Sequence, residues 1–182
     1  MRGLAVAACL LAAPVAADTC PAAPDHTAAL EALISEAQDA PDRSAGMAVS
    51  DRMWALWADA PDARAQALLD EGMERRQSYD YDAAMTAFES LVAYCPDYAG
   101  GYNQRAFIAY LRGDFEAALP DLDRALALQP QHVAALTGKA LTLVALDRNG
   151  EAALALRAAL AMNPWLSERA LLPVLEHDED AL

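Results

Sequence analysis

Small and apolar residues along this chain recur with a period of 34 residues. Pro96, Pro130 and Pro164 mark the period, and five further columns keep the same step. These columns hold Leu68, Tyr102 and Leu136; Gly72, Ala106 and Ala140; Ala84, Ala118 and Ala152; Phe88, Leu122 and Leu156; Leu91, Ala125 and Ala159. A fixed step of this size indicates a repeat protein in which each unit is one supersecondary element.

Each unit predicts a pair of helices. In the middle copy, the apolar spacing predicts helices over residues 99–112 and 115–128, separated by Gly113-Asp114 and ended by Pro130. The small residues Ala106 and Ala118 would let the two helices approach closely. Because one helix pair cannot bury its apolar face alone, the copies are expected to stack. The pattern therefore predicts an all-α fold, a right-handed superhelical solenoid of antiparallel helix pairs.

The middle copy closely resembles the tetratricopeptide repeat family. The residues that carry this resemblance are Tyr102, Arg105-Ala106, Tyr110, Gly113-Asp114-Phe115, Ala118-Leu119, Leu122, Ala125-Leu126-Ala127-Leu128 and Pro130. The resemblance implies three repeats, at residues 65–98, 99–132 and 133–166. The first copy has Tyr79 and the third has Asp147 where the family has glycine, and in the third copy we expect Asn149-Gly150 to form the turn. Pro120 lies inside a predicted helix and is expected to kink it.

The segments on either side of the repeats predict capping helices. Residues 18–64 predict a tail followed by a helical hairpin, with helices over 26–39 and 44–59, just before the first repeat. Residues 167–182 predict a last helix and an acidic tail. Trp54 and Trp57 either form an aromatic pair that binds a ligand, or at least one of them seals the open end of the superhelix.

The first 17 residues predict a secretory signal peptide. A basic start at Met1-Arg2 precedes an apolar run that is too short to span a bilayer, and small residues end at Ala17. The alternative is a lipoprotein signal that is cleaved before Cys9. The residues around Trp54, Pro96 and Tyr102 also look like those of small proteobacterial repeat proteins without an assigned activity. That resemblance implies export to the periplasm of a Gram-negative bacterium.

Two cysteines, Cys20 and Cys95, remain after such cleavage. An exported chain meets an oxidising compartment, so the two can form a structural disulfide or stay as free thiols. We predict that they are joined.

The charge of the chain excludes one class of partner. It has 13 Lys and Arg against 27 Asp and Glu, a formal net charge of −14, so nucleic acid is not an expected partner. The sequence contains no phosphate-binding glycine loop, zinc-protease helix, nucleophile elbow or Cys-x-x-Cys motif. We therefore expect neither an enzyme nor a cofactor or metal site, and no membrane span in the mature chain.

The family resemblance implies a concave groove lined by the first helix of each repeat. Its expected lining is Leu69, Met73 and Arg76; Asn103, Phe107 and Tyr110; Thr137, Leu141 and Val144. The alternative for Leu69, Leu141 and Val144 is packing between helices. Of the donors with which some family members grip a terminal carboxylate, only Asn103 and Arg76 remain, so such a clamp is not expected.

We choose Met73, Arg76, Asn103, Phe107, Tyr110 and Leu141 as the candidate partner-binding residues. Large side chains such as Phe107 and Tyr110 in an open groove are typical anchors for a partner, and Arg76 is expected to engage a nearby acid. The predicted function is a protein-interaction module of the bacterial cell envelope that binds a peptide or a partner helix in its groove. The alternative is a structural subunit of an envelope assembly that uses its convex face or caps.

Overall fold

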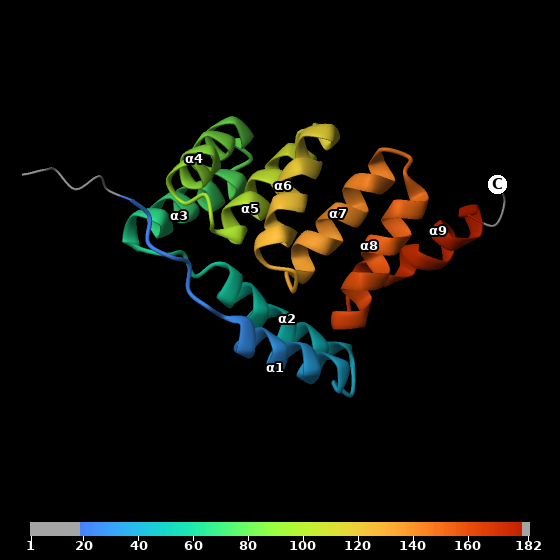
Figure 1. Cartoon of the computed structure of the whole chain (residues 1–182). Coiled ribbons are helices and arrows are strands. Elements are labelled where there is room, and N and C mark those ends of the chain that lie inside the picture. Colours follow the sequence, from blue (N-terminus) through green and yellow to red (C-terminus); the bar gives the residue numbers. More distant parts are fainter. Residues whose placement is uncertain (1–18, 180–182) are drawn as a thin grey trace, which may run out of the picture.

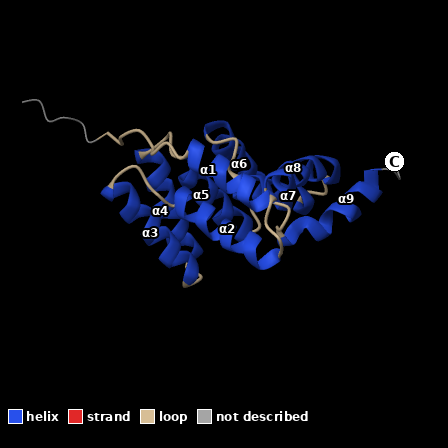
Figure 2. Cartoon of the chain, turned by 90° about the horizontal axis from the view of Figure 1, so that it is seen from below, coloured by secondary structure: helices blue, strands red, loops and turns tan. Residues whose placement is uncertain are grey.

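The computed structural model describes residues 19–179, and every regular element in this range is a helix (Figure 2). The predicted signal peptide and the end of the acidic tail lie outside the described residues. The elements in chain order are α1 (Thr27–Gln38), α2 (Arg43–Trp57), α3 (Ala63–Gln77), α4 (Tyr81–Tyr94), α5 (Ala99–Leu111), α6 (Phe115–Leu128), α7 (Val133–Ala145), α8 (Asn149–Met162), the 3₁₀ helix η1 (Ser167–Leu171) and α9 (Leu172–Glu179).

The three predicted helix pairs are α3–α4, α5–α6 and α7–α8, and each pair stacks on the next (Figure 1). Small residues hold the two helices of a pair close together. A Cβ atom at Gly72 would come within 2.3 Å of Cε1 of Phe88, so the α3–α4 pair has room only for glycine there. In the middle pair, Ala106 and Ala118 are buried at the same contact. The predicted all-α solenoid is confirmed.

The turns inside the three pairs share one backbone conformation. Tyr79, Gly113 and Asp147 occupy equivalent positions 34 residues apart, and all have positive φ, at 61°, 80° and 56°. Glycine adopts this left-handed region freely, whereas Tyr79 and Asp147 are held there against their preference. The expectation that Asn149-Gly150 forms the third turn is therefore wrong, because both are the first residues of α8.

Two prolines lie inside helices without ending them, and the kink expected at Pro120 stays a prediction. Helix α6 is one continuous element from Phe115 to Leu128 with Pro120 inside it. At the other end of the chain, Pro173 is the second residue of α9. A proline in the first turn of a helix removes only a backbone N–H that has no partner within the helix. Helix α9 packs on α8 and covers the exposed end of the third repeat.

The N-terminal hairpin lies in a place that the sequence does not predict. Helices α1 and α2 run beneath the repeats, from the first repeat to the third (Figure 1). Helix α1 packs on α8, and the apolar face of the hairpin joins Val133 and Ala159 in one buried cluster. The expectation of a hairpin that caps the first repeat is therefore wrong. The physical reason is an apolar surface at the third repeat that matches the buried face of the hairpin.

Polar contacts hold the far end of the hairpin to the third repeat. The indole Nε1 of Trp165 donates to the carbonyl of Ala37 at 2.9 Å, and Nδ2 of Asn163 donates to Oγ of Ser50 at 2.7 Å. A Cβ atom at Gly46 would lie 2.2 Å from Cγ of Trp165, so the ring sits directly against the α2 backbone. These contacts join residues more than 110 positions apart in the sequence.

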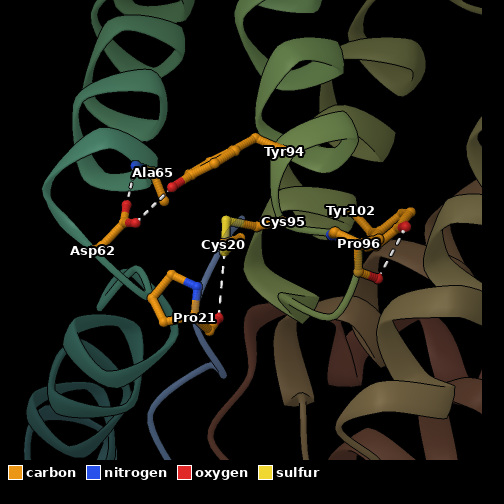
Figure 3. Close-up of a disulfide and its surroundings, with 8 residues drawn as sticks. All are labelled: Cys20, Pro21, Asp62, Ala65, Tyr94, Cys95, Pro96 and Tyr102. Atoms are coloured by element: carbon orange, nitrogen blue, oxygen red, sulfur yellow. Dashed lines mark hydrogen bonds between the residues drawn. A yellow bond between two sulfur atoms is a disulfide. The ribbon is translucent and has the colours of Figure 1, made fainter. Parts of the chain in front are cut away.

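The near end of the hairpin is tied to the first repeat. Cys20, in the tail before α1, forms a disulfide with Cys95 at the end of α4, with Cα atoms 5.2 Å apart (Figure 3). The imidazole Nε2 of His26 lies 2.8 Å from the Asp59 carboxylate, which connects the chain entering the hairpin with the chain leaving it. Both ends of the α1–α2 hairpin are therefore fixed.

Candidate functional site

A cavity of about 760 Å³ lies between α2 and the first helices of the three repeats, α3, α5 and α7. Its far wall includes Trp165 and the residues that follow it. All six candidate partner-binding residues line this one cavity: Met73, Arg76, Asn103, Phe107, Tyr110 and Leu141. The structure therefore brings together residues that are separated by up to 68 positions in the sequence. Their role in binding stays a prediction.

The two aromatic candidates differ in how free they are to meet a partner. Phe107 is 42% exposed, a large fraction for a phenylalanine. Tyr110 instead packs against Phe115, with ring centroids 5.4 Å apart, so part of its surface is already used within the repeat. Phe107 is the better anchor of the two.

Arg76 enters the cavity as a cation without an acidic partner among residues 19–179. Its guanidinium donates to Oε1 of Gln104 at 2.7 Å and lies over the Phe107 ring, 5.3 Å from the centroid. Burial lowers the pKa of Arg76, although an arginine remains charged in proteins. The predicted contact with an acid is therefore not made within the described part of the chain, and the guanidinium is available to a ligand.

Asn103 is the most deeply placed polar candidate. Only 6% of its surface is exposed, and its side-chain amide makes no hydrogen bond with any described residue. Its amide atoms are not among the fully buried atoms without a partner in the described residues, so they are open to the cavity. The cavity wall therefore presents a donor and an acceptor that a bound molecule could satisfy.

Helix α2 supplies the wall that sequence reasoning missed. Met47 and Trp54 lie seven residues apart on one face of α2 and are 51% and 41% exposed. In the sequence, only the proximity of Trp54 to Trp57 pointed to this wall. It predicted either a ligand-binding aromatic pair or a side chain that seals the open end of the superhelix. Neither reading fits Trp57, which is buried inside the molecule, so the end-seal expectation is wrong. Trp54 does face the cavity.

The other groove positions divide between cavity and core. Leu69 is 1% exposed within the core of the first repeat and does not line the cavity. Val144 packs against the cluster formed by α7, α8 and α9. Thr137 lines the cavity, but its hydroxyl donates to the Val133 carbonyl at 3.0 Å. The packing alternative therefore holds for Leu69 and Val144, whereas Leu141 lies in the cavity.

His132 lies beneath the site, where the hairpin meets the third repeat. The ring is fully buried, and its Nδ1 accepts from the backbone N–H of Ala135 at 3.3 Å, which caps α7. Burial lowers its pKa to about 3, so the imidazole is neutral at physiological pH. Within residues 19–179, its Nε2 has no hydrogen-bond partner.

The described residues hold neither a cluster of metal ligands nor a membrane-spanning helix. No group of three or more His, Cys, Asp and Glu side chains in residues 19–179 is arranged to hold a metal ion. No helix in this range is both long and apolar enough to cross a bilayer. The cavity offers hydrocarbon surface, aromatic faces, two guanidinium groups, two carboxylates, hydroxyls and side-chain amides.

Comparison with known proteins gives the same class of fold. The tetratricopeptide repeat family model matches residues 75–137. A TPR repeat-containing protein of Rhizobium etli is 26% identical over 117 residues, which cover 63% of this chain and 56% of that protein. The tetratricopeptide repeat protein 36 homolog of Nematostella vectensis is 37% identical over 65 residues, which cover 36% of each chain. The chain therefore spans about half, or less, of the curated relatives it matches.

Two solved structures each match 64% of this chain. The first TPR domain of Spaghetti (RPAP3), bound to the HSP90 peptide SRMEEVD, superposes with a TM-score of 0.62 at 20% identity and covers 64% of this chain and 94% of that one. The TPR2B domain of yeast Sti1, in a complex with an Hsp70 peptide, gives a TM-score of 0.58 at 24% identity, with 64% and 95% covered. At these identities the likeness concerns the fold.

Stacked helix pairs with a cavity along their first helices define the fold class of helical-repeat proteins. The family model, the matched relatives and the solved structures all point to the same kind of repeat. Residues 75–137 match the tetratricopeptide repeat family, and the fold is that of tetratricopeptide repeat domains.

Proposed function

We propose that this protein is a non-enzymatic interaction module of the bacterial cell envelope that captures a segment of a partner protein at the mouth of its cavity. The observation that carries the proposal is the meeting of exposed aromatic and thioether side chains from two directions. Phe107 comes from the middle repeat, and Trp54 and Met47 come from α2. Exposed large apolar side chains of this kind are enriched where proteins bind partners.

The fold supports the same proposal. Domains with this fold have been solved with HSP90 and Hsp70 peptides, and an apolar groove of a helical repeat suits a short segment with a large apolar side chain. The net charge of −14 favours neutral or basic partners during encounter. The partner therefore combines an apolar anchor with a surface that is not acidic.

The envelope location rests on the N-terminal sequence. The apolar run that ends at Ala17 supports export and cleavage before Asp18, and an oxidising compartment suits the Cys20–Cys95 disulfide. Intact-mass measurement of protein recovered from a bacterial periplasm tests this. A mass that begins at Asp18 is expected, whereas a retained Met1 or a lipid-modified Cys9 would contradict it.

Partner capture is tested by crosslinking in periplasmic extract, with identification of the captured protein by mass spectrometry. The Trp54→Ala, Phe107→Ala double variant should lose one specific protein that the wild type captures. Tyr79→Ala is the matched control, since Tyr79 is 80% exposed at a turn outside the cavity. If the double variant folds normally and still captures that protein, the partner binds elsewhere, and the structural-subunit alternative gains support.

A further inference from the structure

The wall of the cavity formed by α3 and α5 holds two polar side chains, Arg76 and Asn103, that a ligand could bind. Asn103 is more than nine-tenths buried, and its amide has no hydrogen-bond partner among the described residues. Arg76 reaches the same cavity from α3 and meets no carboxylate there. Gln104 accepts from its guanidinium and Phe107 lies under it, so the cation is held in place. The two side chains therefore offer an anion a held guanidinium and an amide donor in the same cavity.

Several of the other polar side chains that line the cavity already have hydrogen-bond partners within the chain. The hydroxyls of Thr137 and Thr142 donate to the carbonyls of Val133 and Gly138 within α7. Ser50 and Asn163 bond to each other. A peptide backbone carries one donor and one acceptor in nearly every residue, and each needs a partner when it is buried. The interior therefore suits a molecule with one polar end better than it suits a length of peptide.

The rest of the lining is hydrocarbon and aromatic surface. Met47 and Trp54 come from α2, Met73 from α3, Phe107 from α5 and Leu141 from α7. The volume of about 760 Å³ lies within the range of about 300–1,000 Å³ that holds small organic ligands. Helix α2 and Trp165 form the opposite wall, so a small molecule would be covered on several sides.

The charges around the cavity limit the charge of the ligand. Arg76 supplies one positive charge in the interior, while the lining also includes Arg43, Asp51 and Glu168. Those three add a net charge of about −1, so a dianion such as a phosphate monoester would meet repulsion that a monoanion largely avoids. A carboxylate fits best, because its two oxygens can accept from the guanidinium in parallel while the Asn103 amide donates to one of them.

We propose that this cavity binds a small amphiphilic monocarboxylate, with its carboxylate on Arg76 and Asn103 and its hydrocarbon body among Met73, Phe107, Leu141 and Trp54. This ligand site goes beyond the capture of a protein partner and does not depend on it. Hydrocarbon burial supplies most of the affinity, and Arg76 and Asn103 supply the preference for a carboxylate. The repeats alone would not form this site, because α2, which lies outside the repeats, forms one of its walls.

The test is a calorimetric titration of purified protein with decanoate, below the concentration at which decanoate forms micelles. Decan-1-ol, which has the same hydrocarbon body without the charge, serves as the reference ligand, followed by Trp fluorescence. The wild type should bind decanoate saturably, one molecule per chain, and at least tenfold more tightly than decanol. Monodecyl phosphate as the dianion should bind more weakly than decanoate.

Two variants test whether Arg76 and Asn103 bind the carboxylate. Arg76→Met and Asn103→Asp should each bring the preference for decanoate over decanol down to about one, while decanol still binds. Arg75→Met is the matched control, because Arg75 is the neighbouring residue on α3, half-exposed, outside the cavity and close to Glu71 and Asp80; it should keep the preference. Circular dichroism and melting identify a variant that fails to fold, and the other variant then decides.

Three results would overturn the proposal. The first is the absence of saturable decanoate binding, and the second is a preference for decanoate over decanol that survives both Arg76→Met and Asn103→Asp. The third is Arg76-dependent binding of an end-capped peptide, with one Glu beside a Leu, when decanoate does not bind. Partner capture is read in extract with the Trp54 and Phe107 variants. A failure of ligand binding is therefore distinguishable from a failure of the proposed function.

Discussion

The indole of Trp57 stacks on the imidazole of His132, with ring centroids 4.5 Å apart and planes 13° apart. Trp57 is the last residue of α2 and His132 is the N-cap of α7, so this pair joins the hairpin to the third repeat. Both rings are buried, and neither Nε1 of Trp57 nor Nε2 of His132 has a hydrogen-bond partner within residues 19–179. The contact therefore needs a neutral imidazole.

The burial of His132 predicts a loss of stability in acid. Its pKa in the folded protein is about 3, below the value of about 6.5 in an unfolded chain. The unfolded chain thus binds more protons between these values, so this contribution is fully present above pH 6.5 and declines as the pH falls toward 3. Between pH 7 and pH 4.5 the loss of unfolding free energy through His132 is about 2–3 kcal/mol.

Urea unfolding at several pH values measures this contribution. His132→Phe keeps an aromatic ring against Trp57 but cannot titrate, so its stability should fall less steeply between pH 7 and 4.5 than that of the wild type. Carboxylates titrate in both proteins, and the difference in slope isolates His132. Equal slopes would show that the imidazole is not held neutral by burial.

Removing the Cys20–Cys95 disulfide should destabilise the protein. The bridge closes a loop across a sequence separation of 75, and the chain-entropy estimate for such a loop is about 4 kcal/mol. The Cys20→Ser, Cys95→Ser variant should therefore unfold at a lower urea concentration than the oxidised wild type, and adding a reductant should change only the wild type. Peptide mapping that finds both thiols free in periplasmic protein would remove the basis for this prediction.

Gly46 on α2 should tolerate no side chain, because a Cβ atom there would lie 2.2 Å from Cγ of Trp165. The Trp165 ring is held by its hydrogen bond to the Ala37 carbonyl, so it cannot move aside without breaking that bond. Gly46→Ala should cost about 1–3 kcal/mol of unfolding free energy.

Gly138→Ala serves as its control. The added Cβ would lie 3.1 Å from Cδ2 of Leu122, the flexible end of a side chain, and alanine is the better helix former. In thermal melts of both variants, Gly138→Ala should leave the melting temperature unchanged or raise it slightly, whereas Gly46→Ala should lower it. Equal melting temperatures for Gly46→Ala and the wild type would show that Trp165 does not hold the hairpin.

Two ion pairs join residues 16 positions apart and differ in burial. Arg105 binds Asp121 through two hydrogen bonds, at 2.6 and 2.7 Å, and their side chains are 27% and 12% exposed. Lys139 pairs with Asp123 at 2.6 Å, but that carboxylate is 59% exposed. Arg105→Met should cost about 3 kcal/mol because it leaves a mostly buried carboxylate without its partner.

Lys139→Met, by contrast, should change stability by less than about 1 kcal/mol. Urea unfolding of the two variants side by side checks the ranking. A larger loss for Lys139→Met than for Arg105→Met would show that burial does not set the strength of these pairs.

The period of the sequence predicts the repeats because each helix pair is stabilised by contacts within itself and with the next copy. The column of Gly72, Ala106 and Ala140 marks the close approach of helices. The i, i+4, i+7 spacing puts each of Arg76, Asn103 and Leu141 on a stripe of its own helix. The stacking of the three first helices brings these stripes together at the cavity.

The position of the hairpin could not be predicted in this way. Trp57 meets His132, and Ala37 meets Trp165, across long stretches of sequence, and neither contact leaves a periodic signal. An amphipathic helix shows that it has an apolar face but not which surface covers that face. The contribution of Met47 and Trp54 to the site follows from that docking, so it was missed together with it.

The docking of the hairpin on α8 also fixes how many repeats this protein can have. In a helical-repeat array each unit contacts only its neighbours, so whole units can be gained or lost. Here α1 and α2 span from the first repeat to the third, and the disulfide holds them at the near end. Inserting or deleting one 34-residue unit would move α8 out of register with the hairpin. The length of the α1–α2 hairpin therefore matches an array of three repeats and no other number.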